Sequence, residues 1–431
     1  MADITPFLPD SAARDGAGQV TVGGLRLADL AREWGTPLYV YDAVTIRQAV
    51  KRLRIALSAY PAASEIAYAA KAYFAPQFAQ RMAALGLDGD VVSLGELRMA
   101  YSNGFAPERI HLHGNNKSAD ELRAALALDI HAVVVDSLDE LAFLEGLAAE
   151  AGSRACVWLR VAPGVDVHTH AYRQTGHVAT KFGLSLNDGQ AVEAIRRARA
   201  SRWLDLTGLH AHLGSQVFEV DPYQEAIRRL CQLARDTDFT PQEFSPGGGW
   251  GVRYTEADPD VAVEAWVQAL AETLQGESRM GGWPLPRLVI EPGRWLSARA
   301  GVAVYAVGAC KVGGDGTRWA AVDGGMADNL RPALYGAAYT AFLPERPDEP
   351  ATERVNIVGK FCESGDFLLK DALLPPVRRG DWLAIPVAGA YHLSMASNYN
   401  LAPRPTALWV EDGQVSLLQV REALLETGWW A

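Results

Sequence analysis

Short apolar runs alternate with helical segments over most of the sequence, and this alternation most constrains the fold. Apolar runs of this length, bounded by turn-forming residues, predict buried strands. The eight predicted strands are residues 66–70, 90–93, 110–113, 132–135, 155–161, 206–211, 243–245 and 288–291. Amphipathic stretches predict helices at 45–60, 76–85, 94–103, 118–128, 137–150, 187–200, 223–236 and 259–274. Strands that alternate with helices pair in parallel, and eight is the number that closes a (β/α)8 TIM-like barrel. A doubly wound open sheet is the alternative.

The last third of the sequence has a different, β-rich pattern. Strands are predicted at 302–307, 318–322, 353–358, 382–387, 407–410 and 414–418, with a helix only at 420–426. This pattern predicts a C-terminal β-sandwich or β-barrel domain that begins near Arg299. A further strand is predicted at 38–41, with Asp42 as the N-cap of the following helix. Residues 165–183 predict a long loop after the fifth strand, rich in Gly, His and Thr.

Composition excludes several kinds of protein. The formal net charge of −11 argues against non-specific binding to nucleic acid or an anionic membrane. We find no apolar run long enough to span a membrane, and no basic-then-apolar leader at the N-terminus. The four cysteines lie far apart, which predicts reduced thiols in a cytoplasmic protein and no metal site.

Lys71 ends the first predicted barrel strand, in the run E-I-A-Y-A-A-K-A-Y-F. Burial of its ammonium group would favour the neutral amine, the form that attacks carbonyl groups. We therefore expect a buried, nucleophilic lysine. The alternative is a structural lysine that reaches solvent at the strand exit.

Gly247, Gly248 and Gly249 follow the seventh predicted strand. Glycines let backbone N–H groups approach an anion closely, and barrels often bind phosphate after strands seven and eight. A tight strand-to-helix turn would use the same residues.

Glu291-Pro292-Gly293-Arg294 closes the eighth predicted strand. A carboxylate at this position could accept a hydrogen bond from a pyridinium nitrogen. Arg294 could bind a carboxylate or a phosphate in a bidentate way. A structural ion pair is the alternative.

His210-Ala211-His212 ends the sixth predicted strand, and Ser215 follows. Strand alternation places both imidazoles on one side. Either could stack on an aromatic cofactor, and Ser215 could donate to a phosphate. The alternative is a core histidine, a reading that suits His210 better than His212.

Two polar motifs stand out in the β-rich part. Cys362-Glu363-Ser364-Gly365-Asp366 lacks the histidines of a metal site, and its thiol could donate a proton; an acidic turn is the alternative. The loop around Tyr391 is polar and aromatic, as binding loops often are.

These motifs together resemble the fold-type III pyridoxal-phosphate-dependent decarboxylases. The matching motifs, in order, are G-T-P-L-Y-V-Y-D, Y-A-A-K-A, D-V-V-S-L-G-E-L, H-G-N-N-K-S, T-K-F-G-L, H-A-H-L-G-S-Q, G-G-G-W-G, E-P-G-R, V-D-G-G-M-A-D-N-L-R-P-A-L-Y-G, C-E-S-G-D and G-A-Y-H-L-S-M-A-S-N-Y-N. Each is weak alone, but their number, order and spacing along nearly the whole chain are specific.

The resemblance implies pyridoxal 5'-phosphate as cofactor and assigns its contacts. Lys71 would bond it, Glu291 would pair with its ring nitrogen, and His212 would stack on its ring. The implied phosphate and cofactor contacts are Ser215, Gly247, Gly248, Gly249, Gly293, Arg294 and Tyr391. The resemblance also implies a barrel domain at 43–299 and a β-rich domain formed by 1–42 and 300–431.

The resemblance assigns the substrate contacts to Arg294, Arg331, Tyr335, Glu363 and Tyr391. Cys362 would be the proton donor, reaching the site from the other subunit of a homodimer with shared active sites. Two arginines and an acid suit a substrate whose distal end carries both a carboxylate and an ammonium group. This favours decarboxylation of meso-2,6-diaminopimelate to L-lysine.

Other readings stay open. The substrate could be ornithine, arginine, carboxynorspermidine or a carrier-bound amino acid, and a racemase-like or non-catalytic binding protein is a third class. The chain departs from the family pattern at Leu94, at Phe244-Ser245-Pro246 and at Trp250, and these departures leave a modified substrate possible.

Overall fold

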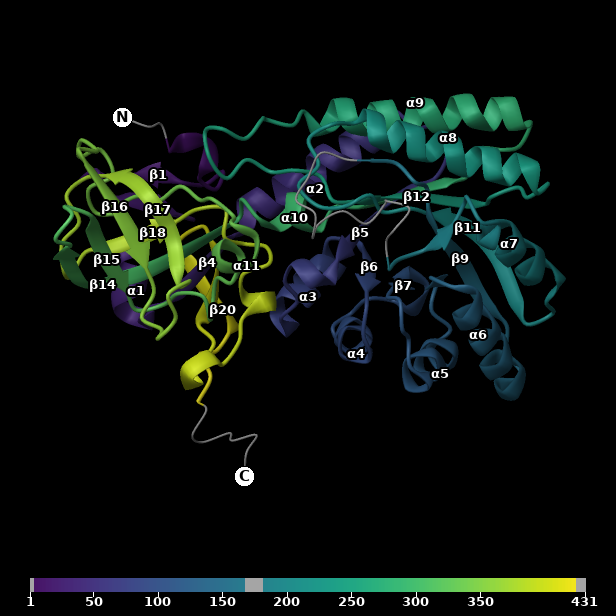
Figure 1. Ribbon diagram of the computed structural model, residues 1–431, viewed down its shortest axis with the longest axis horizontal. Helices are drawn as coiled ribbons and strands as arrows, with labels where there is room; N and C mark the ends of the chain where they lie inside the picture. Colours follow the sequence, from purple (N-terminus) through teal and green to yellow (C-terminus); the bar gives the residue numbers. More distant parts are fainter. Residues whose placement is uncertain (1–3, 167–180, 424–431) are drawn as a thin grey trace. The chain divides into compact units, whose positions relative to one another are not determined.

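The computed structural model describes residues 4–166 and 181–423 of the chain (Figure 1). Most of the predicted loop at 165–183 and part of the predicted helix at 420–426 lie outside these residues. The chain forms two compact units. Unit 1 comprises Met1–Ala49, Val252–Asp260 and Leu296–Ala431, and unit 2 comprises Val50–Gly251 and Val261–Trp295. No helix among the described residues is long and apolar enough to cross a membrane.

Unit 2 is a closed parallel barrel, as predicted. Its strands are β5 (Ser64–Ala69), β6 (Asp88–Val91), β7 (Ile110–Leu112), β8 (Ala132–Val135), β9 (Ala155–Ala162), β11 (Leu204–His210), β12 (Glu243–Gly248) and β13 (Arg287–Glu291). They pair in that order, and β13 pairs back to β5. The short strand β10 (Leu184–Ser185) adds to β9 in parallel. The ring closes because each strand joins the next through a crossover segment.

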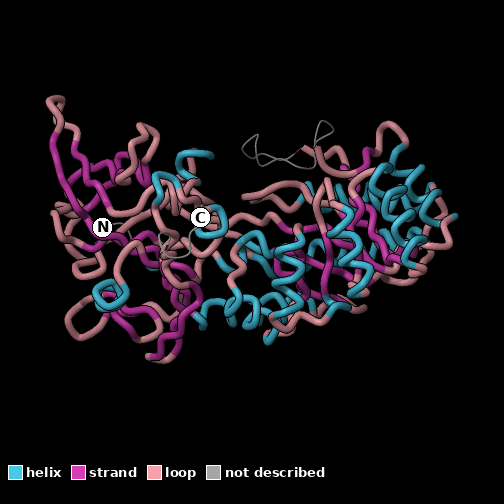
Figure 2. Tube along the Cα trace, turned by 90° about the horizontal axis from the view of Figure 1, so that it is seen from below, coloured by secondary structure: helices cyan, strands magenta, loops and turns pink. Residues whose placement is uncertain are grey.

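Helices lie around the outside of the strand ring (Figure 1, Figure 2). They are α2 (Ala43–Leu57), α3 (Pro76–Ala84), α4 (Leu94–Ser102), α5 (Ala119–Leu128), α6 (Leu138–Ala151), α7 (Gln190–Ala200), α8 (Asp221–Asp236), α9 (Val263–Gly281) and α10 (Gly293–Ser297). Ser118 and Glu121 form a capping box that fixes the start of α5. Helix α9 begins and ends later than the predicted 259–274. It ends at Gly281 because Gly282 adopts a left-handed backbone conformation.

The barrel interior contains two polar layers, where barrels usually hold Val, Ile and Leu. Alternation along a strand points residues i and i+2 the same way, so one strand serves both layers. The lower layer comprises Asp88, His111, Trp158 and Glu243. Trp158 Nε1 donates to Glu243 Oε1 at 3.2 Å, and the His111 and Trp158 rings lie 4.5 Å apart.

The upper layer takes one residue from each of five strands or strand ends, and three of these lie two residues beyond a lower-layer residue of the same strand. It comprises Asp90, His113, His210, Ser245 and Glu291. All five side chains are buried. Because these are the carboxyl ends of the strands, this layer forms the floor of the barrel mouth.

Unit 1 is β-rich, as predicted. Its larger sheet contains β4 (Leu38–Asp42), β14 (Gly301–Val312), β15 (Arg318–Val322), β16 (Glu353–Val358), β17 (Phe367–Leu374), β18 (Trp382–Ile385), β19 (Thr406–Glu411) and β20 (Gln414–Gln419). A small sheet contains β1 (Ala13–Arg14), β2 (Val20–Val22) and β3 (Leu25–Arg26). The helices α1 (Leu27–Trp34) and α11 (Arg331–Tyr335) complete the unit.

The sequence did not predict β17. Asp371, inside that strand, has a positive φ of 51°, and two register shifts interrupt its pairing with β16. These irregularities break the two-residue alternation that reveals a strand. Asp42 does cap α2, since its Oδ2 accepts the Thr45 N–H at 2.9 Å.

Candidate active site

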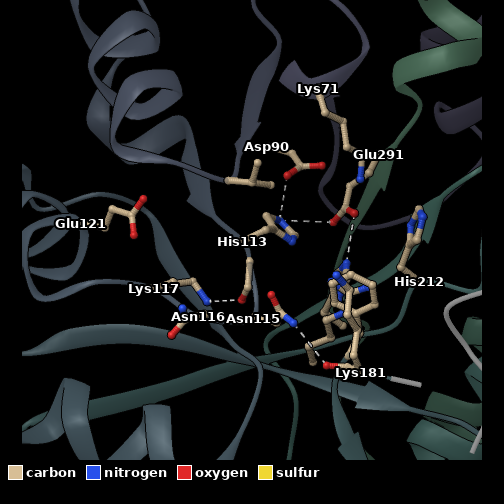
Figure 3. Close-up of a pocket in the computed structure, with 15 residues that line it drawn as sticks. Lys71, Asp90, His113, Asn115, Asn116, Lys117, Glu121, Lys181, His212 and Glu291 are labelled. Atoms are coloured by element: carbon tan, nitrogen blue, oxygen red, sulfur yellow. Dashed lines mark hydrogen bonds and ion pairs between the residues drawn. The ribbon is translucent and has the colours of Figure 1, made fainter. Parts of the chain in front are cut away.

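A cavity of about 390 Å³ opens at the carboxyl ends of the barrel strands (Figure 3). It brings together three predicted residues from distant parts of the sequence, Lys71, His212 and Glu291. The other lining side chains that matter here are Asp90, His113, Lys117, Arg160, Lys181, Phe182 and His210. A cavity of this size suits a small cofactor together with a small substrate.

Lys71 lies on a short 3-10 helix, η2 (Ala70–Ala72), directly after β5. Its neighbours Ala70 and Ala72 are buried, but Lys71 is exposed to the cavity. The prediction of a buried lysine is therefore wrong, because the turn that follows the strand carries the side chain out of the wall. The Lys71 side chain extends toward Glu291 (Figure 3).

Glu291 ends β13 and is 4% exposed. His210 Nε2 lies 3.0 Å from its Oε2, and Ser245 Oγ donates to its Oε1 at 2.7 Å. Burial raises the pKa of Glu291, but its close neighbour His210 and the two hydrogen bonds outweigh burial and hold the pKa well below its usual value. Glu291 is therefore an ionised carboxylate at the base of the cavity.

His113 and Asp90 lie beside Glu291 (Figure 3). His113 Nε2 is 3.6 Å from Asp90 Oδ1 and 3.9 Å from Glu291 Oε1. Burial lowers the pKa of His113 well below its usual value, so the imidazole is neutral. Burial raises the pKa of Asp90 to about 7, while the charge of Lys71 opposes the shift. Asp90 is thus the carboxyl group of this cavity that titrates near neutral pH.

His212 is held by the glycine loop. Gly248 N–H donates to His212 Nδ1 at 3.3 Å, which places the ring proton on Nε2. Burial, followed by the charge of Lys71, lowers the pKa of His212 well below its usual value. His210 and His212 both line the cavity, as strand alternation predicted.

The three glycines are required by close backbone contacts. A Cβ at Gly248 would lie 1.8 Å from the Glu291 carbonyl oxygen, and one at Gly249 would lie 1.9 Å from the Gly214 carbonyl oxygen. Gly247 has a φ of +80°, and its N–H donates to Ser245 Oγ at 3.1 Å. The loop therefore packs against both neighbouring strands.

Ser215 and Arg294 are brought together. Arg294 donates to Ser215 Oγ at 2.8 Å, and Arg294 is 6% exposed. Gly293, which begins α10, lies against β5: a Cβ there would be 2.8 Å from Ala69 Cβ. These contacts collect a hydroxyl and a guanidinium near the start of a short helix, which suits an anionic group.

The remaining predicted residues belong to unit 1. Arg331 begins α11 and is 1% exposed; its guanidinium lies 4.8 Å from the Tyr254 ring and donates to the Tyr339 hydroxyl. Tyr335 ends the same helix and is half-buried. In the present conformation Tyr254 and Tyr339 cover the Arg331 guanidinium.

Two loops of unit 1 carry the other predicted residues. Cys362 and Glu363 are exposed, between β16 and β17. Tyr391 is half-buried with a φ of +60°. That conformation is unusual for a bulky residue and tends to occur where function requires it.

Sequence reasoning assigned no role to several residues of the cavity wall. Asp90, His113 and Lys181 lay within recognised motifs without being singled out. Arg160, whose guanidinium lies 4.5 Å from the centre of the Phe182 ring, was missed altogether. Its signal was a single charge inside the apolar run V-W-L-R-V-A, a pattern that rarely occurs without a functional or structural reason.

The residues of this site fit pyridoxal phosphate. Lys71 offers an amine for an aldehyde, ionised Glu291 offers an acceptor for a protonated ring nitrogen, and His212 offers a flat neutral ring. Ser215 and Arg294 offer donors for a phosphate. Lys71, Glu291 and His212 line one cavity, and the chemistry of the five residues matches the parts of that cofactor.

Comparison with known proteins agrees with this fit. Residues 45–298 match the family model described as pyridoxal-dependent decarboxylase, pyridoxal binding domain. A diaminopimelate decarboxylase of Bacillus subtilis is 41% identical over 420 residues, which cover 96% of each chain. A crystal structure of diaminopimelate decarboxylase from Helicobacter pylori, complexed with L-lysine, is 34% identical with a TM-score of 0.85 and covers 93% of this chain and 97% of that one. The M. jannaschii diaminopimelate decarboxylase structure has a TM-score of 0.91 at 31% identity, and covers 97% of this chain and 98% of that one. The chain belongs to the pyridoxal-dependent decarboxylase family and groups within it with the diaminopimelate decarboxylases.

Proposed function

We propose that this protein decarboxylates meso-2,6-diaminopimelate to L-lysine and carbon dioxide, with pyridoxal 5'-phosphate as its cofactor. The observation that carries the proposal is the meeting of Lys71, Glu291 and His212 in one cavity, in a chain that matches diaminopimelate decarboxylases over nearly its full length. When bound, the cofactor supplies a ring that accepts the electron pair left by departing carbon dioxide.

Three residues of the barrel would do the work around that ring. Lys71 would hold the cofactor through its amine and release it to the amine of the substrate. Glu291, ionised and buried, would keep a proton on the ring nitrogen. His212, fixed by the Gly248 N–H, would support one face of the ring and exclude water from it.

The substrate contacts proposed for unit 1 explain the choice of amino acid. Arg331 would bind the distal carboxylate of diaminopimelate, and Glu363 would bind the distal ammonium. Ornithine lacks that carboxylate, so it would leave a buried guanidinium without its partner, which is costly.

Cys362 is the proposed proton donor to the α-carbon. Its exposure, in the loop between β16 and β17, supports a role completed by a second copy of the chain. We therefore infer a homodimer in which each subunit lends Cys362 and Glu363 to the other's site. The four cysteines are free thiols, which is consistent with a cytoplasmic enzyme.

The proposed function is tested by carbon dioxide release from a panel of amino acids. Release from meso-diaminopimelate should exceed release from ornithine and arginine by orders of magnitude. Faster release from ornithine would assign the chain to another substrate class.

The lysine assignment has a separate optical test. Purified protein with added pyridoxal phosphate should show a visible absorption band that differs from the band of free cofactor, and Lys71→Ala should lack it. An unchanged band in Lys71→Ala would remove Lys71 from its role.

A further inference from the structure

Glu291 has both carboxylate oxygens occupied by donors from two neighbouring strands. His210, at the end of β11, reaches Oε2, and Ser245, on β12, reaches Oε1, at 3.0 and 2.7 Å. An ionised carboxylate only accepts hydrogen bonds, so His210 Nε2 and Ser245 Oγ must each bring a proton. The sequence assigned no role to Ser245, and for His210 it offered only stacking on a cofactor or a place in the core.

Ser245 is committed to donating toward Glu291. Its hydroxyl oxygen already accepts the Gly247 N–H at 3.1 Å, which leaves its own proton for the carboxylate. The same hydroxyl therefore connects the glycine loop with the acid that faces the cofactor ring.

Bulk water has little access to these three groups. Ser245 is 0% exposed, His210 is 1% exposed and Glu291 is 4% exposed. Hydrogen bonds to a buried charge are strong, and the loss of one leaves the charge without compensation.

The location of a proton shared by Glu291 and a ring nitrogen depends on these donors. A buried carboxylate without donors is a strong base and would take the proton from the ring. With both oxygens supplied, the carboxylate stays ionised and the proton stays on the ring nitrogen.

We propose that Ser245 and His210 are positioning residues, which hold Glu291 ionised and so keep the ring nitrogen of the bound cofactor protonated. The inference rests on the proposed function, and it adds two residues that act through Glu291. His113, whose Nε2 is 3.9 Å from Glu291 Oε1, completes the surroundings of the carboxylate as a neutral group.

The test substitutes Ser245→Ala in the full-length protein and binds pyridoxal phosphate labelled with ¹⁵N in its ring. In the native protein the ¹⁵N resonance should have the shift of a protonated ring nitrogen at pH 7. In Ser245→Ala it should move toward the unprotonated shift. Since one hydrogen bond to a charged group is removed, kcat should fall roughly 10- to 100-fold while KM changes little.

Two controls separate positioning from general damage. Ser278→Ala removes another buried hydroxyl of the barrel unit, one with no hydrogen-bond partner among the described residues, and should change neither the resonance nor kcat. Ser245→Thr keeps a hydroxyl and should restore the protonated shift. If Ser245→Ala fails to bind cofactor, the ¹⁵N shift and kcat are measured in His210→Gln instead, which changes the donor at Glu291 Oε2.

The outcomes are distinct. A native ¹⁵N shift and native kcat in Ser245→Ala would overturn the inference while leaving the decarboxylase intact. A native protein that releases no carbon dioxide from meso-diaminopimelate would instead overturn the proposed function. A lower kcat with an unchanged ¹⁵N shift would also overturn the inference, because the damage would then lie elsewhere.

Discussion

Glu243→Gln should destabilise the barrel without altering the chemistry at its mouth. Glu243 begins β12 and lies in the lower polar layer, 7% exposed. Its Oε2 is 2.7 Å from His131 Nε2 and 3.2 Å from Arg287 Nη1. Trp158 donates to its other oxygen, so the carboxylate is surrounded by donors.

The pKa of Glu243 sets the size of the effect. Burial raises that pKa, but the hydrogen bond and charge of His131 and the charge of Arg287 outweigh burial and lower it from 4.5 to about 2. A difference of that size corresponds to about 3 kcal/mol of unfolding free energy at neutral pH. The folded-state pKa is depressed, so the stabilisation is complete above the unfolded pKa and is lost as pH falls from about 4.5 toward 2.

Urea unfolding of the native protein and of Glu243→Gln, each at two pH values, measures the contribution of Glu243 to the unfolding free energy. The gap in unfolding free energy should be about 3 kcal/mol at pH 7 and about 2 kcal/mol at pH 3.5. Glu264→Gln is the matched control: its side chain is 45% exposed and pairs with Arg52 at 2.7 Å, so it should cost less than about 1 kcal/mol. A gap that is below 1 kcal/mol at pH 7, or that grows as the pH falls, would refute the reasoning.

Two further predictions concern residues of unit 1. Cys362→Ala should bind cofactor normally but turn over slowly. When it is dissociated and reassembled with an equal amount of inactive Lys71→Ala, half of the dimers should be mixed. Each mixed dimer would carry one intact site, with Lys71 from one subunit and Cys362 from the other. Activity should then recover to about a quarter of the native value, and no recovery would contradict shared sites. Arg331→Lys replaces a planar bidentate donor with a point charge, so KM for meso-diaminopimelate should rise roughly tenfold while any slow ornithine reaction is unchanged. An equal loss for both substrates, measured as kcat/KM, would show that Arg331 does not read the distal carboxylate.

The barrel was predictable because its strands are short and apolar and are bounded by turn-forming residues. The predicted strand at 132–135 coincides with β8, and that at 288–291 begins one residue after β13 does. Strands that are buried on both faces of a sheet give short continuous apolar runs, and runs of this length indicate strands rather than helices. The strand β17 and the short helix α11 were not predicted, because an irregular backbone and a length of five residues leave little periodic signal.

The cavity was only partly predictable. Lys71, Glu291 and His212 could be named because their motifs resemble a known family. Their supports could not, since the partner of a buried group lies on another strand and sequence spacing does not reveal it. Ser245 illustrates this: it lies in the stretch that departs from the family pattern, yet it donates directly to Glu291.

The two polar layers explain how one barrel separates stability from chemistry. Glu243 and Ser245 lie two residues apart on β12 and point to the same side, but one meets His131 and Arg287 and the other meets Glu291. In the lower layer, the hydrogen bond to His131 and the charge of Arg287 outweigh burial and lower the pKa of Glu243 to about 2, so these contacts stabilise the fold until the pH falls below about 4.5. The upper layer gives Glu291 hydrogen-bond donors from His210 and Ser245 instead, so its carboxylate keeps a charge to offer a ligand. A charge change at Glu243, below the floor of the cavity, should therefore lower the unfolding free energy and leave the ¹⁵N resonance of bound cofactor unmoved, whereas Ser245→Ala should move that resonance.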